Sequence, residues 1–287
     1  MEFIIEAFLD ALADSIKLFP FLLLTYVLME YLEQKMEDTS HGILERSGHV
    51  GPLLGGILGI FPQCGFSAAA ANLYAGGIIT AGTLSAVFLS TSDEMLPIFI
   101  SEAVAPGIII KLLGVKLLLA VITGFLIDII FHLVPFLHTR HKDIHHLCEQ
   151  EHCHCEDGIW KSACKHTLKI FLFLILVSFA LNLVIGMAGE EQLASVMMNR
   201  PVVGELIAGI VGLIPNCAAS VVITQLYLEG LIGTGAMMTG LLVGAGVGLL
   251  VLLRMNHSLK ENSSIIAALY IAGVLWGMLL EAVGFSL

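Results

Sequence analysis

Charged residues are scarce in this chain, and several motifs of enzymes and ATP-driven pumps are missing. Only 13% of the 287 residues are charged, 57% are hydrophobic and the mean hydropathy is +0.93, outside the range of soluble domains. The chain has no Gly-Lys-Ser/Thr phosphate-binding loop, which excludes ATP as a direct driver. It has no Cys-x-x-Cys motif, and no feature suggests nucleic-acid binding. The composition therefore predicts an integral membrane protein that is not an enzyme and requires no cofactor.

The N-terminal segment lacks the basic stretch of a cleavable secretion signal. It carries Glu2, Glu6, Asp10 and Asp14 instead, so we expect no such signal. Other segments are apolar over lengths that cross ~30 Å of hydrocarbon, so the lipid bilayer is a predicted partner. These apolar runs cover residues 15–33, 107–131, 166–188, 232–253 and 264–285.

One short pattern occurs twice, and the two copies lie 153 residues apart. Residues 59–65 read GIFPQCG, and residues 212–218 read GLIPNCA. The match runs without a gap over residues 51–82 and 204–235, with 13 identities in 32 positions. Self-similarity at a fixed period is typical of duplicated architecture. Paired Gly/Pro-interrupted apolar segments in two halves of a membrane chain indicate a transport site.

The repeated segment predicts a break inside each half of the chain. Residues 51–61 and 65–75 form two half-helices that meet at Pro62, or residues 51–77 cross once as a Pro-kinked helix. Eleven residues span ~16 Å, about half of the hydrocarbon thickness, which fits a re-entrant hairpin. We therefore expect an all-α integral membrane protein of two inverted five-element repeats, each with a re-entrant hairpin, with about 10 helical segments in total. The predicted boundaries are 1–131 for the first membrane repeat, 132–165 for a loop and 166–287 for the second membrane repeat.

The distribution of lysine and arginine favours inverted over parallel repeats. A hairpin gives each half an odd number of crossings, and 9 of the 13 basic residues then face the cytoplasm. A single crossing gives parallel repeats and leaves Lys35, Arg46, Arg254 and Lys260 outside. The inverted arrangement predicts that both termini lie outside and that the central loop is cytoplasmic. The nine basic residues are Lys35, Arg46, Arg140, Lys142, Lys161, Lys165, Lys169, Arg254 and Lys260.

Polar groups gather at the two Pro-x-Cys tips. Proline lacks an amide hydrogen and frees a carbonyl upstream, and such backbone survives at membrane depth only where protein or water covers it. Helices that begin just after the tips add positive dipole ends. We expect a substrate site near the midplane, lined by Pro62, Gln63, Cys64, Ser67 and Asn72 of the first copy and by Pro215, Asn216, Cys217, Ser220 and Gln225 of the second.

The chemistry of Cys64 and Cys217 points to a soft substrate. Thiolates favour Cu(I), Zn²⁺ and similar ions, and trivalent arsenic shares that preference. Buried free cysteines are also common packing residues, so the packing interpretation stays open. Recurrence at the same place in both halves favours the ligand interpretation more than one cysteine would.

A polar run interrupts the apolar stretch 78–103 in the first half only. It reads Ser90-Thr91-Ser92-Asp93-Glu94, whereas the second half has Gly and Ala at the matching positions. A carboxylate at the bilayer centre costs ~2.5–3.5 kcal/mol on insertion scales and usually marks an ion or proton pathway. Asp93 and Glu94 are therefore candidates for binding a cation or for exchanging protons. The alternative is a surface turn between two short helices.

The loop at 132–165 is rich in histidine and cysteine. Dense His/Cys tracts are a compositional signal of metal binding, although the spacing matches no defined zinc finger. The loop therefore predicts an exchangeable metal-binding segment, with a solvated linker as the alternative. Its candidate ligands are His145, His146, Cys148, His152, Cys153, His154 and Cys155.

The doubled Gly-x-x-Pro-x-Cys segment, the five-element halves and the His-rich loop together resemble a known family. This is the ten-helix heavy-metal exporter family, whose members are called arsenic efflux or manganese transporter proteins. Residues 62–65 and 90–94 carry the likeness. The resemblance implies a bacterial inner (cytoplasmic) membrane exporter for a metal or metalloid. The second tip departs from the first in having Ala218 where the first has Gly65.

We therefore expect a secondary transporter that exports arsenite or a soft divalent cation, coupled to protons and working by alternating access. One alternative is a manganese exporter that uses Asp93, Glu94 and the amides, because hard cations prefer oxygen ligands. A second alternative is an organic-anion carrier or channel that uses the helix dipoles. A third is an intramembrane thiol oxidoreductase, which requires Cys64 and Cys217 to lie within ~7 Å of each other. A homo-oligomer is compatible with the sequence.

Overall fold

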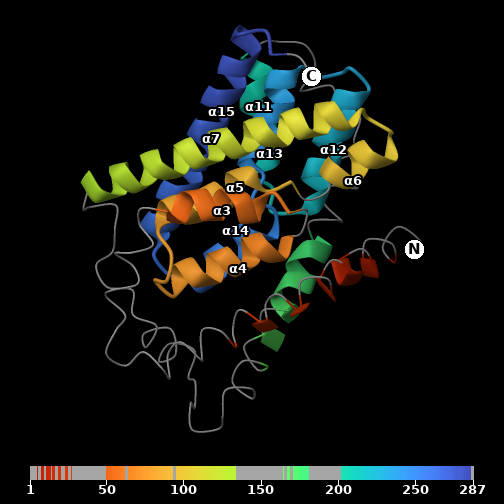
Figure 1. Cartoon of the computed structure of the whole chain (residues 1–287). Helices are drawn as coiled ribbons and strands as arrows, with labels where there is room; N and C mark the ends of the chain where they lie inside the picture. The colour runs from red at the N-terminus through yellow and green to blue at the C-terminus, as the bar shows by residue number, and fades with distance from the viewer. Residues whose placement is uncertain are drawn as a thin grey trace, which may run out of the picture.

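The computed structural model describes residues 50–61, 64–92, 95–133, 171–180 and 202–285, with scattered positions in 5–27 and 164–168. The described residues are helical, with no strand among them (Figure 1). Three described segments are long and apolar enough to cross a membrane: Pro106–Leu133, Thr234–Met255 and Leu259–Ala282. These agree with three of the runs predicted above and confirm an all-helical, multi-pass membrane protein. Most of the runs 15–33 and 166–188 lies outside the described residues.

In the part of each half that the structure describes, five helices follow one another in the same order. The helices of the first half are α3 (Gly51–Gly59), α4 (Cys64–Ala75), α5 (Ala81–Ser90), α6 (Met95–Ser101) and α7 (Pro106–Leu133). Those of the second are α11 (Val203–Gly212), α12 (Cys217–Leu228), α13 (Thr234–Val243), α14 (Val247–Met255) and α15 (Leu259–Ala282). The offset of 153 residues seen in the short pattern therefore holds for every one of these helices, to within one residue at each start.

Two breaks recur in each half. The first separates α3 from α4 and α11 from α12, where the sequence places a proline in each copy. Proline cannot donate the helical hydrogen bond, and Asn216 has an extended backbone that starts α12 afresh. The second break separates α5 from α6 and α13 from α14. In the first half its described residues are Thr91 and Ser92, which are both buried.

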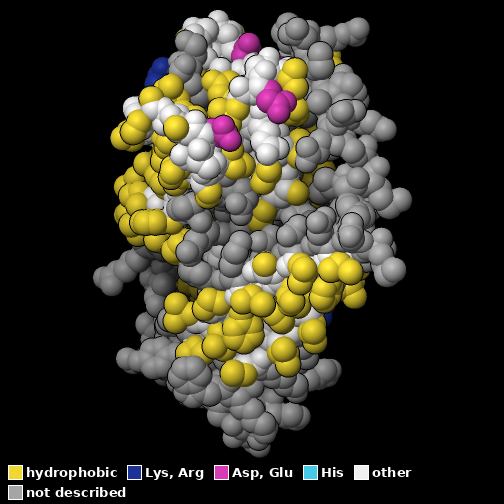
Figure 2. All heavy atoms as spheres, turned by 90° about the vertical axis from the view of Figure 1, so that its right-hand side faces the viewer, with side chains coloured by type: hydrophobic (Ala, Val, Ile, Leu, Met, Phe, Trp, Pro, Cys, Tyr) yellow, Lys and Arg dark blue, Asp and Glu magenta, His cyan; other side chains and the backbone are white. Residues whose placement is uncertain are grey.

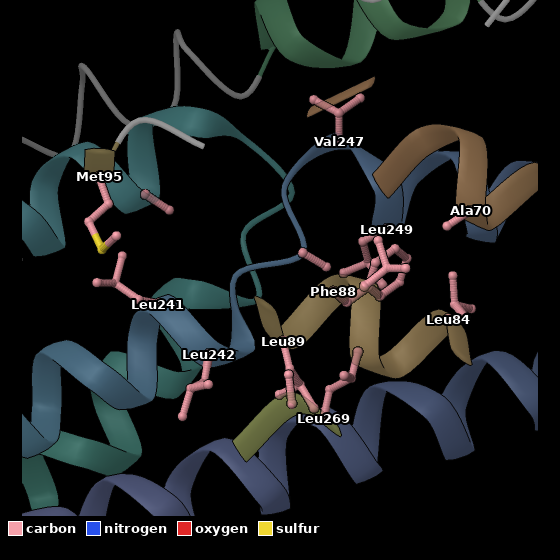
Figure 3. Close-up of a cluster of buried hydrophobic side chains, with 14 of the residues drawn as sticks. Ala70, Leu84, Phe88, Leu89, Met95, Leu241, Leu242, Val247, Leu249 and Leu269 are labelled. Atoms are coloured by element: carbon pink, nitrogen blue, oxygen red, sulfur yellow. The ribbon is translucent and has the colours of Figure 1, made fainter. Parts of the chain in front are cut away.

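The two halves pack closely on each other. Within each half, the first, third and fifth helices pack together: α3, α5 and α7 in one, α11, α13 and α15 in the other. Helix α4 lies along α14 of the other half, and α12 contacts both α6 of the other half and α13 of its own (Figure 1). The buried core is consequently shared, and Leu89 of α5 lies beside Leu269 of α15 (Figure 3).

Glycine pairs set the distance between the third and fifth helices of each half. A Cβ added at Gly124 would lie 2.7 Å from the Gly82 carbonyl oxygen, and one at Gly277 would lie 2.6 Å from the Gly235 carbonyl oxygen. The two pairs occupy matching positions in the repeats. Small residues at such crossings allow helix backbones to approach closely in membranes, where no hydrophobic force between helices is available.

Carboxylates from the long helices cap the third helix of each half. Asp128 Oδ1 accepts from the Gly82 amide at 2.7 Å, and Glu281 Oε2 accepts from the Gly235 amide at 2.8 Å. Thr80 Oγ1 adds a bond of 2.8 Å to Asp128 Oδ2. A carboxylate at a helix N-terminus satisfies amides that have no helical partner and interacts favourably with the dipole. Both residues align in the sequence, and their shared role becomes evident only in the fold.

The outer surface is apolar, and the largely hydrophobic interior also contains polar side chains. Large side chains on α7 and α15 point outward, among them Ile110, Leu118 and Leu275, each at least 60% exposed. Figure 2 shows hydrophobic side chains over much of the described surface, with acidic ones near one end. Serine, threonine and asparagine side chains are buried instead. A lipid environment accounts for this distribution, since hydrocarbon covers apolar side chains and cannot satisfy polar ones.

We predict that Gly124→Val destabilises the fold and that Gly114→Val, on the same helix, does not. Valine at 124 meets the Gly82 carbonyl oxygen and the Cβ atoms of Ala86 and Pro52 within 3 Å, whereas nothing lies within 4 Å of a Cβ at 114. Overpacking of this kind costs about 1–3 kcal/mol. Thermal inactivation in detergent, followed by size-exclusion chromatography, measures the difference. Equal midpoints for the two variants would contradict the proposed helix contact.

Candidate functional site

A small cavity lies where the second tip meets the breaks in both halves. The volume that the centre of a water-sized sphere can occupy in it is about 20 Å³. This is enough for about one water molecule or a small ion. Its walls come from the α5–α6 break, the start of α12, and the end of α13. The lining residues are Thr91, Ser92, Met95, Gly212, Asn216, Cys217, Ala219, Ser220, Gly240, Leu241, Gly244 and Gly246.

Three predicted site residues of the second tip come together on this cavity: Asn216, Cys217 and Ser220. Asn216 begins α12, and its Oδ1 accepts from the Ala218 amide at 3.4 Å. Ser220 Oγ donates to the Cys217 carbonyl oxygen at 2.8 Å. Cys217 is not in a disulfide and is 6% exposed. The tip therefore presents one sulfur and several oxygens to a space the size of an ion.

Opposite helix ends face each other across the cavity. The first turn of α12, from Cys217 to Ser220, contributes the positive end of a helix dipole. The last turn of α13 contributes Leu241, and Gly244 follows it, so this side carries the negative end. A bound species could therefore find donors on one wall and carbonyl acceptors on the other.

The serine of the first tip, Ser67, lies at a close helix contact. Ser67 is buried against α14, where a Cβ added at Gly248 would lie 2.7 Å from the Ser67 Cβ. The position equivalent to Gly248 in the first half is Met95, which lines the cavity and lies next to Leu241 (Figure 3). A glycine therefore permits the close approach of α14 to Ser67, and a methionine stands at the matching position beside the cavity.

The remaining predicted residues fall into two groups. Asn72 is buried and Gln225 is exposed, and neither lines the cavity, while Pro215 is half-buried in the break before α12. Pro62, Gln63, Asp93, Glu94 and the side chain of Cys64 lie outside the described residues, as do all seven candidate ligands of the loop. Thr91 and Ser92, from the polar run next to Asp93, do line the cavity.

Lys116 is a site residue that the sequence analysis missed. It lies in α7, is fully buried, and its ammonium donates to the carbonyl oxygens of Thr91 and Leu241, the latter at 3.0 Å. Both acceptors line the cavity, and they come from different halves of the molecule. The sequence contains a signal for this residue, because Lys116 lies in the apolar run 107–131. A lysine inside a membrane-spanning segment indicates a functional role, as a carboxylate there does.

A second polar cluster joins the halves away from the cavity. Glu261 Oε2 accepts from Tyr74 Oη and from Asn256 Nδ2, both at 3.2 Å, and Asn256 also donates to Asn262 Oδ1 at 2.8 Å. All four side chains are buried. Tyr74 belongs to α4, and the other three residues lie at the junction of α14 and α15. The cluster therefore links α4 to the second half by hydrogen bonds. Within the described ranges, no three His, Cys, Asp or Glu side chains are placed to hold a metal ion together.

The comparisons with known proteins agree with the helical architecture. A family model described as "Putative, 10TM heavy-metal exporter" matches residues 2–190, which is more than half of the chain. The match includes the first tip, the polar run and the loop. The comparisons with curated proteins and with solved structures give no match. The chain therefore belongs to this family of ten-helix membrane proteins, which is described as exporting heavy metals.

Proposed function

We propose that the protein is a secondary transporter that exports arsenite or a soft divalent cation through a site between the two Pro-x-Cys tips. The observation that carries this proposal is the cavity at the second tip, which brings Asn216, Cys217 and Ser220 to the helix breaks of both halves. Broken helices that meet inside a membrane protein are where transporters hold their substrates. The matched family adds the expectation of a heavy-metal cargo.

The donor set supports a soft species. A buried thiol that is not in a disulfide favours thiophilic metals and trivalent arsenic, and the neighbouring oxygens of Asn216 and Ser220 complete a small polar surface. The space suits an ion or a small hydroxylated metalloid better than a bulky organic anion. Cys64 is proposed to supply a second thiol from the first tip when the tips approach each other.

The packing of α4 on the other half supports transport by alternating access. Because α4 lies along α14, rocking one half against the other changes the surroundings of the helix that follows the first tip. Asp93 or Glu94, next to the cavity wall in the sequence, is the proposed proton-coupling group. The repeats are proposed to be inverted in the bacterial inner membrane, with the termini outside. The His/Cys loop would then collect metal on the cytoplasmic side.

We predict that inverted membrane vesicles take up arsenite, Cd²⁺ or Zn²⁺ under an imposed proton gradient, and that Cys217→Ser lowers this uptake at least about tenfold. Mutation of a residue that only hydrogen-bonds to a metal ligand lowers metal affinity by about ten- to hundredfold. Loss of a ligand itself should therefore lower affinity by at least as much. Cys164→Ser is the matched control, because Cys164 is an exposed free cysteine. Isotope uptake measures the rates.

The Mn²⁺ alternative makes the opposite prediction. Uptake of Mn²⁺ alone, lost in Asp93→Asn and kept in Cys217→Ser, would reject the soft-substrate proposal. Uptake of none of these species by the wild-type protein would reject export of a metal or metalloid altogether.

The inverted topology predicts which side of the membrane single labelling sites face. Cysteines placed singly at Lys35 and Lys260, in a background without reactive native cysteines, should be labelled only from the cytoplasmic side. A cysteine at Arg200 should be labelled from the outside. Membrane-impermeant maleimide on whole cells and on inverted vesicles provides the measurement. Labelling of position 260 from the outside would instead indicate parallel repeats.

A further inference from the structure

Glu205 is a buried carboxyl group in the apolar helix α11. Its side chain is 3% exposed, and within the described residues its Oε2 atom has no hydrogen-bond partner. An ionised carboxylate is costly to bury without a partner, and a buried carboxyl in a membrane protein usually marks a pathway for an ion or a proton. Glu205 is therefore a candidate binding group that the cavity at the second tip does not include.

The fold does not require a carboxyl group at this place. The matching position in the first half is Pro52, and Thr239 of α13 matches Ala86 of α5. A Cβ added at Gly124 would lie 2.9 Å from the Cβ atoms of both Pro52 and Ala86, so these two residues line the crossing of α3, α5 and α7. The second half builds the same crossing from α11, α13 and α15, with a carboxyl and a hydroxyl in place of two apolar side chains. Packing alone does not account for this difference.

Glu205 lies between an exposed carboxylate and the cavity. Helices α11 and α13 pack on each other, and both end at the cavity, which Gly212 and Leu241 line. At the opposite end of α13, the exposed Glu281 accepts a hydrogen bond from the Gly235 amide. Glu205 stands seven residues before Gly212, which is about 10 Å along the helix axis. The carboxyl of Glu205 is therefore an intermediate point between the surface and the site.

The helices packed on α11 place no cation beside Glu205 among the described residues. These helices are α12, α13 and α15, and α13 contains no titratable side chain. The hydroxyl of Tyr270 donates to the Leu206 carbonyl oxygen at 3.1 Å, and Lys260 lies at the opposite end of α15 from Glu281. Arg200, in the segment before α11, lies outside the described residues. The titratable residues of the packed helices are Cys217 and Tyr227 on α12 and Lys260, Glu261, Tyr270 and Glu281 on α15.

We propose that Glu205 relays the coupling proton between the Glu281 end of the molecule and the cavity. The proposal rests on the proposed function and adds a residue to its proton pathway. The carboxylate of Glu205 binds one proton when water reaches it from the Glu281 end. It releases that proton toward the cavity, where the proposed coupling group, Asp93 or Glu94, accepts it. In the proposed topology the C-terminus lies outside, which is the side from which a proton-driven exporter takes its protons.

The test compares two modes of transport by the full-length protein in proteoliposomes, with radiolabelled arsenite and Cd²⁺ as the cargo. Exchange of labelled for unlabelled cargo needs no net proton movement, whereas uptake driven by an imposed proton gradient does. Glu205→Gln cannot bind and release a proton, so it should keep exchange. It should lower proton-driven uptake at least about a hundredfold, which is the usual contribution of a positioned proton-transfer group. Glu205→Asp keeps the carboxyl and should keep both modes. Glu229→Gln is the matched control, because Glu229 is an exposed glutamate at the end of α12 in the same half.

A second measurement uses the wild-type protein and needs no variant. Dicyclohexylcarbodiimide is an apolar reagent that adds to protonated carboxyl groups, so it should modify Glu205 and block proton-driven uptake. Mass spectrometry of peptides locates the adduct. A carboxylate that stays ionised in an ion pair, for example with Arg200, would remain unmodified, and this result would overturn the inference even if Glu205→Gln fails to fold.

The outcomes separate this inference from the proposed function. If Glu205→Gln keeps proton-driven uptake, or if folded Glu205→Gln protein loses exchange as well, the relay role of Glu205 is rejected while metal export stands. If the wild-type protein exchanges cargo but shows no proton-driven uptake, proton coupling and the relay are both rejected. If the wild-type protein transports neither arsenite nor Cd²⁺ in either mode, the proposed function itself is rejected.

Discussion

Helix breaks inside a membrane protein leave backbone amides and carbonyls without partners, and no water is present in hydrocarbon to satisfy them. The arrangement of the other polar groups in this molecule follows from that constraint. Amides at the start of α5 and α13 are satisfied by Asp128 and Glu281, which the long fifth helices supply. Carbonyls at the ends of the same two helices are satisfied by Lys116. Charged side chains on the fifth helix of each half, α7 and α15, thus bind backbone groups at the ends of the third helices, α5 and α13. The cavity lies where the C-terminal ends of α5 and α13 meet the second tip.

The two halves share one architecture but are not chemically equivalent. Three matching positions differ in ways that bear on the site: Met95 against Gly248, Lys116 against Leu269, and Thr91 against Gly244. Met95 and Thr91 line the cavity, and Lys116 adds a charge behind its wall. A duplicated fold supplies two similar breaks, and substitutions in one copy have concentrated polar chemistry at one of them.

The sequence predicted the breaks better than the contacts between them. The recurrence of Gly-x-x-Pro-x-Cys placed the first break in each half, because proline at a fixed position acts through local geometry alone. The cavity at Ser220 depends on how α12 packs against α6 and α13, and the local sequence pattern does not determine this packing. The partners of Lys116 could not be predicted for the same reason, since Leu241 lies 125 residues away.

The hydrogen bonds of Lys116 connect the two halves of the molecule. Lys116 donates to one carbonyl in its own half and to another in the opposite half. Rocking the halves apart in the proposed transport cycle breaks the bond to Leu241, whereas the bond to Thr91 moves with the first half. A buried carbonyl left without a donor is costly, so the closed arrangement is restored unless a substrate or water replaces the ammonium there.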